Sequence, residues 1–137
     1  MSLKIKKNKL KIIDNINGAV MHGLKKSDSS FSGFGEVYFS NIKYESIKAW
    51  KRHLKMTMNL VVPIGKVKFV FYDEVKDKFD EHIIGKNDYF RITVFPEIWF
   101  GFKGLDKKEN LVMNFADIEH NPEEVERRNI NHFKYSW

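Results

Sequence analysis

Residues 46–65, SIKAWKRHLKMTMNLVVPIG, carry the most structural information in this chain. Polar and apolar side chains alternate in the first half, and an apolar run follows before the Pro and Gly that close the stretch. This pattern predicts two β-strands, over 46–54 and 57–63, joined by a short turn. Four positions define its spacing: Lys51-x-His53, then four residues, Met58, then six residues, and Gly65.

That spacing resembles the first cupin motif, H-x-H, three or four residues, E, six residues, G. The resemblance implies a small β-barrel with a polar pocket. Lys51 occupies the place of one histidine and Met58 the place of the glutamate. Histidine and carboxylate side chains are the usual ligands of a divalent ion, so this departure predicts a pocket without a metal.

Length and composition predict one domain, residues 1–137, with one hydrophobic core, because 42% of the residues are hydrophobic and 15% aromatic. The chain has no cysteine, which excludes disulfides and thiolate chemistry. No apolar run reaches the length of a transmembrane helix, and the apolar stretch near the N-terminus is too short for a signal peptide. We therefore expect a cytoplasmic protein with no membrane partner.

The formal net charge of +6 favours anionic partners. Much of the excess lies near the N-terminus, in a segment that we interpret as solvated: Lys4, Lys6, Lys7, Lys9 and Lys11. The rest of the chain is only mildly basic, which disfavours nucleic acid as a partner. A nucleic-acid-binding barrel stays a weaker alternative, on the grounds of charge and aromatic content.

The whole chain reads as short strands separated by turn signals. We predict strands over 10–13, 18–24, 35–42, 46–54, 57–63, 66–72, 79–84, 90–95, 98–103 and 109–117. Asn121-Pro122-Glu123-Glu124 has the features of a helix start, so a short C-terminal helix is expected over 122–129. The predicted fold is all-β: a cupin-type antiparallel jelly-roll barrel with that short helix.

Residues two apart on a strand share a face. One face of 47–53 runs from apolar to polar and ends in Lys51 and His53, as a barrel wall does from its packed bottom to its open mouth. With Tyr38 and Asn114, this face would form a pocket for a sugar that carries hydroxyls and a keto group. Histidine could move a proton near neutral pH. The alternative interpretation leaves Lys51 and His53 as rim residues in water.

Several segments, in this order and spacing, resemble the small sugar-nucleotide cupins of the dTDP-4-dehydrorhamnose 3,5-epimerase type. They are GFGEVYFS, IKAWKRH, MNLVVPIGKVKFVFYD, ITVFPEIWFGFKGL and NLVMNFADIEHNPEE, and the resemblance spans roughly residues 18–130. It implies a jelly-roll subunit, a homodimer and a nucleotide-diphosphate sugar at the barrel mouth. It also implies a role in making deoxysugars for surface polysaccharides, by proton transfer beside a C4 ketone without metal or cofactor.

The resemblance places the family's basic histidine at His53, within W-K-R-H-L-K. It places Asn114 where the family has its acidic tyrosine, and we find no clear counterpart of the family's late carboxylate in NINHFKYSW. A related branch, the sugar 3,4-ketoisomerases, has an H-A-H segment that Lys51 and His53 match in part. The spacing of residues 46–65 thus matches the family well, but several of the family's catalytic side chains are replaced or absent.

We predict His53 and Lys51 as catalytic residues. The predicted substrate-binding residues are Arg52, Lys55, Tyr38, Asn59, Trp99 and Asn114. Among them, Arg52 and Lys55 are candidates for the pyrophosphate, together with Lys48, and Trp99 could stack on a ring. Two hypotheses follow: an isomerase acting on a nucleotide-linked 4-keto sugar, or a cupin that only binds a sugar or sugar nucleotide.

Overall fold

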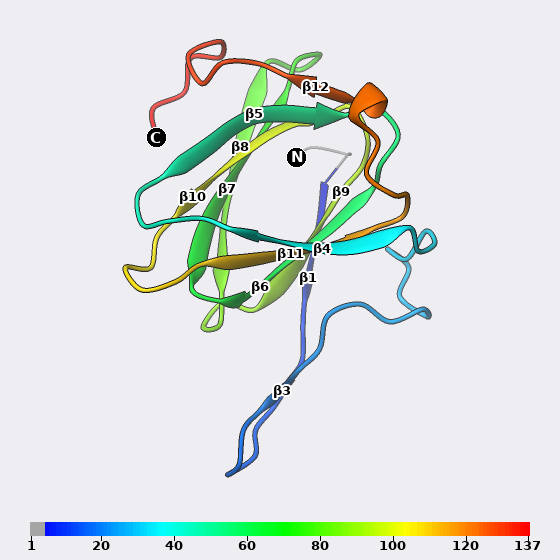
Figure 1. Ribbon diagram of the computed structural model, residues 1–137, viewed down its shortest axis with the longest axis vertical. Helices are drawn as coiled ribbons and strands as arrows, with labels where there is room; N and C mark the ends of the chain where they lie inside the picture. The colour runs from blue at the N-terminus through cyan, green and yellow to red at the C-terminus, as the bar shows by residue number, and fades with distance from the viewer. Residues whose placement is uncertain (1–4) are drawn as a thin grey trace.

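The computed structural model describes residues 5–137, which form two five-stranded antiparallel sheets packed face to face (Figure 1). The first sheet has the order β1 (Ile5–Lys9), β9 (Phe90–Val94), β6 (Met58–Ile64), β11 (Leu111–Ala116), β4 (Glu36–Asn41). The second has the order β12 (Val125–Arg127), β5 (Ile47–His53), β10 (Trp99–Gly104), β7 (Lys66–Asp73), β8 (Lys78–Gly85). A small hairpin, β2 (Ile12–Ile13) with β3 (Val20–Met21), extends away from this body.

The core lies between the sheets, where the inward side chain of every second residue is apolar. It includes Leu60 and Val62 of β6, Phe69 and Phe71 of β7, and Ile92 of β9, all at most 3% exposed. These alternating strands were visible in the sequence, and the predicted all-β antiparallel jelly roll is confirmed. No helix of residues 5–137 is long and apolar enough to cross a membrane.

The predicted helix over 122–129 is wrong. Only one turn of 3₁₀-helix forms, Pro122–Glu124, and Asn121 caps it by accepting a hydrogen bond from the backbone of Glu123 at 3.0 Å. The chain then becomes extended and pairs as β12 with the edge of β5, with Val125 opposite His53. The capping signal was correct, but pairing with a free sheet edge overrides a short helical preference.

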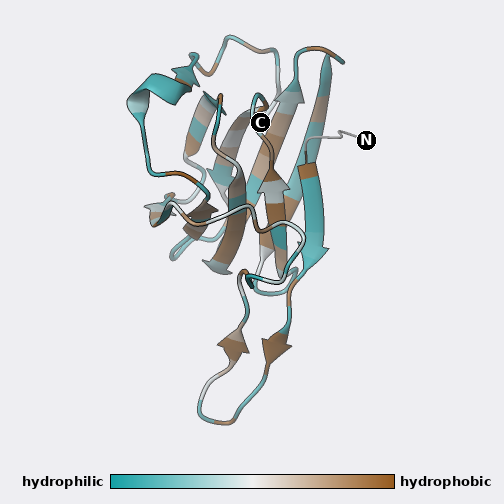
Figure 2. Cartoon of the chain, turned by 90° about the vertical axis from the view of Figure 1, so that its right-hand side faces the viewer, coloured by the Kyte–Doolittle hydropathy of each residue, from teal (hydrophilic) through white to brown (hydrophobic). Residues whose placement is uncertain are grey.

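The basic N-terminal segment, interpreted above as solvated, forms β1. This strand is an edge of the first sheet, and Ile5 lies opposite Val94 of β9. Its lysines at 6, 7 and 9 are exposed, and Figure 2 shows the strand as hydrophilic along most of its length. Lys4 lies outside the described residues. Over residues 5–9 the lysine side chains are therefore exposed, and the backbone is paired in a sheet.

The buried side chain of Asn110 connects three segments of the chain by hydrogen bonds at one end of the barrel. Its Oδ1 accepts hydrogen bonds from the backbone N–H groups of Lys66 and Asp106, both at 3.0 Å. Its Nδ2 donates to the carbonyls of Ile42 at 3.1 Å and Asp106 at 2.9 Å.

Gly65 has a φ of 84°, and a Cβ there would lie 2.1 Å from a backbone carbonyl oxygen, so only glycine fits.

Candidate active site

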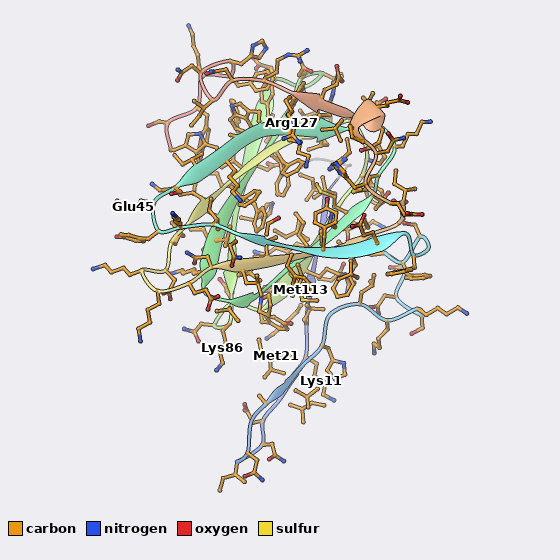
Figure 3. The ribbon with its side chains drawn as sticks, viewed as in Figure 1. Lys11, Met21, Glu45, Lys86, Met113 and Arg127 are labelled. Carbon is orange, nitrogen blue, oxygen red and sulfur yellow. The ribbon has the colours of Figure 1, made fainter. Side chains whose placement is uncertain are left out.

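A cavity of about 410 Å³ opens between the two sheets, bordered by the edge strand β4 on one side and by β5 and β12 on the other. Apolar side chains form much of its wall: Met58, Leu60, Phe69, Phe100, Phe102 and Val112. The polar side chains in the lining are Tyr38, Ser40, Lys48, Lys51, Asn114, Arg127 and Arg128. Figure 3 shows Arg127 on β12, above the space between the sheets. This combination suits a ligand with an anionic part and a less polar part.

His53 at the end of β5 forms a buried pair with Glu124 of the 3₁₀ turn. The His53 Nδ1 and the Glu124 Oε2 lie 2.5 Å apart, and the two side chains are 2% and 3% exposed. The other carboxylate oxygen of Glu124 accepts from the backbone N–H groups of Lys55 at 3.0 Å and Met56 at 2.9 Å. Glu124 is thus held at three points, and it fixes the orientation of the imidazole.

The protonation states of this pair follow from burial and hydrogen bonding. Burial lowers the pKa of His53 and outweighs the opposing effect of Glu124. Burial would raise the pKa of Glu124, but the hydrogen bonds from His53 and from the backbone of Met56 and Lys55 outweigh it, so this pKa is lowered. A neutral His53 therefore donates from Nδ1 to an ionised carboxylate, which leaves a lone pair on Nε2.

The free Nε2 of His53 is buried, and no atom of residues 5–137 hydrogen-bonds to it. The imidazole stacks on Phe100, with ring centroids 6.0 Å apart and an interplanar angle of 13°. His53 does not itself line the cavity, but Phe100 and Lys51 do. The imidazole thus lies directly beside the cavity and has the chemistry of a general base.

Lys51 supplies a cation on the same strand. In the second sheet it lies opposite Phe100 of β10 and Arg127 of β12. Burial lowers the pKa of Lys51, and the neighbouring charge of Arg127 lowers it further. A half-buried ammonium in this position can stabilise a negative charge that develops on a ligand oxygen.

Tyr38 and Asn114 face each other across β4 and β11, and both line the cavity. The Asn114 Nδ2 donates to the Tyr38 hydroxyl oxygen at 2.9 Å, and the Asn114 Oδ1 accepts from the backbone of Asn59 at 3.2 Å. The Tyr38 hydroxyl contacts the Met56 sulfur at 3.7 Å. Burial raises the pKa of Tyr38, so its phenol stays protonated near neutral pH and can donate a proton.

The structure thus brings four of the predicted site residues together: Lys51, Tyr38 and Asn114 in the lining, and His53 beside it. Arg52 and Trp99 lie on the opposite face of the second sheet. The Arg52 guanidinium lies 4.8 Å from the Trp99 ring centre and pairs with Glu74 at 3.1 Å. Trp99 packs on Phe133 and donates from Nε1 to Glu74 at 2.6 Å. Strand alternation explains this, because each is a neighbour of an inward-facing residue.

Asn59 and Lys55 also lie away from the cavity. Asn59 is on the outer face of the first sheet, where its Nδ2 donates to the carbonyl of Ser30 at 3.1 Å and its Oδ1 accepts from Thr93 at 2.7 Å. These bonds use its side chain for packing a loop onto the sheet. Lys55 is exposed in the turn after β5. Neither residue lines the cavity.

Sequence reasoning missed Glu124, Arg127 and Arg128, which all come from the segment predicted as a helix. The segment NINHFKYSW offers no counterpart of the family's late carboxylate, and the predicted helix start accounts for Glu124 without a role at the site. The pairing of β12 with β5 places all three at the site. Within residues 5–137 no three His, Asp or Glu side chains gather as metal ligands would, and a pocket without a metal stays a prediction.

Several solved structures are similar to this chain over most of its length. A dTDP sugar isomerase from Desulfovibrio desulfuricans G20 shares 32% identity at a TM-score of 0.91, over 95% of this chain and 87% of that one. A 3,4-ketoisomerase mutant from Thermoanaerobacterium thermosaccharolyticum, in complex with TDP-4-keto-6-deoxyglucose, shares 17% identity at a TM-score of 0.79, over 93% and 90% of the two chains.

The dTDP-4-dehydrorhamnose 3,5-epimerase of Sulfolobus tokodaii shares 14% identity at a TM-score of 0.85, over 98% of this chain and 82% of that one. At this identity the epimerase and the ketoisomerase show the fold alone. No protein-family model and no curated protein matches the sequence.

Proposed function

The chain belongs to the family of dTDP-sugar isomerases with the cupin fold, and from this premise we propose that it isomerises or epimerises a nucleotide-linked 4-keto sugar by proton transfer. The observation that carries the proposal is the His53–Glu124 pair, 2.5 Å apart and buried beside the cavity. A neutral imidazole held by a carboxylate is what removal of a weakly acidic proton requires.

In this mechanism the Nε2 of His53 takes a proton from the carbon next to the C4 ketone. The electron pair of the broken C–H bond moves toward the ketone oxygen and forms an enolate. The ammonium of Lys51 stabilises the negative charge on that oxygen. Delivery of a proton to the opposite face of the same carbon restores the C4 ketone and gives an epimer. For the 3-keto isomer, the proton of the C3 hydroxyl passes to the C4 oxygen, a proton is delivered to C4, and the C3 oxygen becomes the ketone.

Tyr38 supports the second half of the reaction. Its phenol lines the cavity, is protonated at neutral pH and is oriented by Asn114 at 2.9 Å. The family resemblance places Asn114 where a proton-donating tyrosine is expected, and the neighbouring strand supplies the hydroxyl instead. Tyr38 therefore provides the acid that Asn114 cannot.

The anionic part of the substrate fits the cationic border of the cavity. Lys48 of β5 and Arg127 of β12 line the opening, and the lining contains no carboxylate. The adjacent Arg128 also lines the opening, and it pairs with Glu126 at 4.0 Å. Guanidinium groups bind phosphate oxygens with two parallel hydrogen bonds, so we assign the nucleotide diphosphate to this border. The apolar wall then faces the sugar.

We also propose that the chain forms a homodimer and works in the cytoplasm. Support for the dimer comes from large apolar side chains left exposed on the β2–β3 hairpin and on the outer face of the first sheet. They include Ile16 at 99%, Val20 at 56% and Phe39 at 57% exposed. Light scattering coupled to gel filtration measures the dimer directly, and a monomer at micromolar concentration would contradict it.

The function is tested with a dTDP-4-keto-6-deoxy sugar in D₂O, by following deuterium at the carbons beside the ketone and the identity of the product. We expect turnover by the native protein, a fall of about 10²–10⁴-fold in His53→Ala, and a fall of about 10²-fold in Lys51→Met. The control His132→Ala changes a histidine in the segment that follows β12, outside the cavity lining. Tight binding with no exchange in the native protein would instead establish the binding-only alternative.

A further inference from the structure

A second cavity, of about 270 Å³, lies on the outer side of the first sheet and shares no lining residue with the active site. It is formed by the end of β1, the start of the segment that follows β3, and one residue of β9. Its lining residues are Asn8, Lys9, Leu10, Lys11, His22, Gly23, Lys25, Asp28, Ser29 and Arg91. Figure 3 shows Lys11 at the base of the hairpin, below the body of the barrel.

The walls of this cavity are fixed by hydrogen bonds between segments that are distant in sequence. The backbone of Leu10 donates to the carbonyl of Tyr89, and that of His22 to the carbonyl of Lys11, both at 3.0 Å. The hydroxyl of Tyr89 donates to the carbonyl of His22 at 2.7 Å. The cavity is therefore part of the folded scaffold and not a gap between loose loops.

The lining is strongly cationic. Lys9, Lys11, Lys25 and Arg91 face one carboxylate, that of Asp28. Asp28 pairs with the Nη1 of Arg91 at 3.1 Å. No carboxylate of residues 5–137 is within ion-pair distance of the three lysine ammonium groups, so most of this positive charge is uncompensated.

Arg91 gives the cavity a built polar centre. Its side chain is only 5% exposed, and its Nη1 is held by the carbonyl of Gly23 at 2.9 Å as well as by Asp28. Its buried Nε has no hydrogen-bond partner among residues 5–137, and neither has the buried Nε2 of His22. Buried polar atoms of this kind are costly unless a ligand pairs with them, and the Nε of Arg91 is always a donor.

We propose that this second cavity binds a phosphate group, independently of the catalytic site. A phosphate offers several acceptor oxygens for the Nε of Arg91 and up to two negative charges for the surrounding lysines. A carboxylate would satisfy fewer donors and less of the charge. The same chemistry is offered by free inorganic phosphate and by the phosphates of a nucleotide, and the experiment separates these sources.

The test is calorimetric titration of the full chain with inorganic phosphate and, separately, with dTDP, at constant ionic strength set with chloride. Lys9→Ala/Lys11→Ala removes two cations from the cavity. Lys86→Ala/Lys107→Ala removes the same charge from exposed positions outside both cavities. Arg91→Lys keeps the charge of the buried group but removes its Nε.

We expect saturable binding of phosphate to the native protein. The dissociation constant should rise at least about tenfold in the Lys9/Lys11 variant and in Arg91→Lys. It should stay unchanged in the Lys86/Lys107 variant. If the source is a nucleotide, inorganic phosphate gives no heat, and dTDP binds with a second equivalent per chain that the Lys9/Lys11 variant loses. Equal weakening in both lysine variants, or no saturable binding of either probe beyond one equivalent of dTDP, overturns the proposal. Neither result bears on turnover at His53.

Discussion

The Nδ1 of His53 lies 2.5 Å from the Oε2 of Glu124, although 71 positions separate the two residues in the sequence. The contact joins the end of a central strand to a single turn of 3₁₀-helix. It exists because β12 pairs with the edge of β5 immediately after that turn. The catalytic unit is therefore assembled by the sheet and not by local sequence.

Replacing Glu124 by Gln tests the positioning role of the carboxylate. The amide oxygen can still accept from the backbone N–H groups of Lys55 and Met56. The neutral amide no longer stabilises the imidazolium that forms when His53 takes a proton. We expect kcat to fall about 10–100-fold, with the acid limb of the pH profile shifted to lower pH. Steady-state kinetics between pH 5 and 8 measures both. A fall in kcat without a shifted profile would indicate a merely structural role for Glu124.

Acidification is expected to weaken the fold in two stages. The pKa of His53 is lowered from its ordinary value of 6.5, so below that value the unfolded chain binds the proton more readily and stability falls. The pKa of Glu124 is lowered from 4.5, so its contribution is present above 4.5 and is lost as pH falls through the lower, folded value. Urea unfolding from pH 8 to 2.5 covers both stages. His53→Gln should lose less stability than the native protein between pH 7 and 5, and equal losses would contradict the assignment.

Tyr38→Phe should separate the two proton transfers. Removal of the hydroxyl eliminates the proposed acid but leaves His53 intact, so product formation should fall about 10²-fold while deuterium exchange beside the ketone continues. Mass spectrometry of recovered substrate measures the exchange. Tyr44→Phe is the matched control, because Tyr44 lies outside the cavity lining. Loss of exchange together with turnover would place Tyr38 in the first proton transfer instead.

Asn110→Ala tests how much the hydrogen bonds of this buried side chain contribute to the stability of the fold. The substitution removes four hydrogen bonds of a buried side chain and leaves backbone groups of three segments unpaired. We expect about 2–4 kcal/mol of lost stability in urea unfolding. Asn87→Ala, at an exposed position in the turn between β8 and β9, should cost under about 0.5 kcal/mol. Similar small costs for both would show that water replaces the bonds of Asn110.

The sequence was sufficient for the fold because period-two alternation holds over most of each strand. It breaks in β5, where the register with β10 shifts and Ala49 packs in the same outer cluster as Trp50. The inward face predicted for 47–53 is therefore correct only for Lys51 and His53. The sequence also predicted one pocket formed by four residues that all lie at or beside the cavity: Lys51, His53, Tyr38 and Asn114. The same alternation could have excluded Arg52, Asn59 and Trp99 from the lining, since each is adjacent in sequence to an inward-facing residue. Their prediction as binding residues rests on chemical type, which carries no information about the side of the sheet on which a side chain lies.

The part of the site that could not be predicted depends on non-local pairing. Asn121 and Pro122 are a correct signal for a helical start, but nothing nearby in sequence says that the helix ends after one turn. That outcome depends on the free edge of β5, about 70 residues earlier. Glu124 and Arg127 reach the site only through this pairing.

The position of β1 at the edge of the first sheet has a consequence for how copies of the chain meet. An edge strand exposes unpaired backbone groups on which another strand can add, and repeated addition leads to fibres. Here three of the five residues, Lys6, Lys7 and Lys9, are exposed lysines. Two such edges would bring like charges together at a spacing of about 4.8 Å. The lysines that make this chain basic thus protect its sheet against open-ended growth.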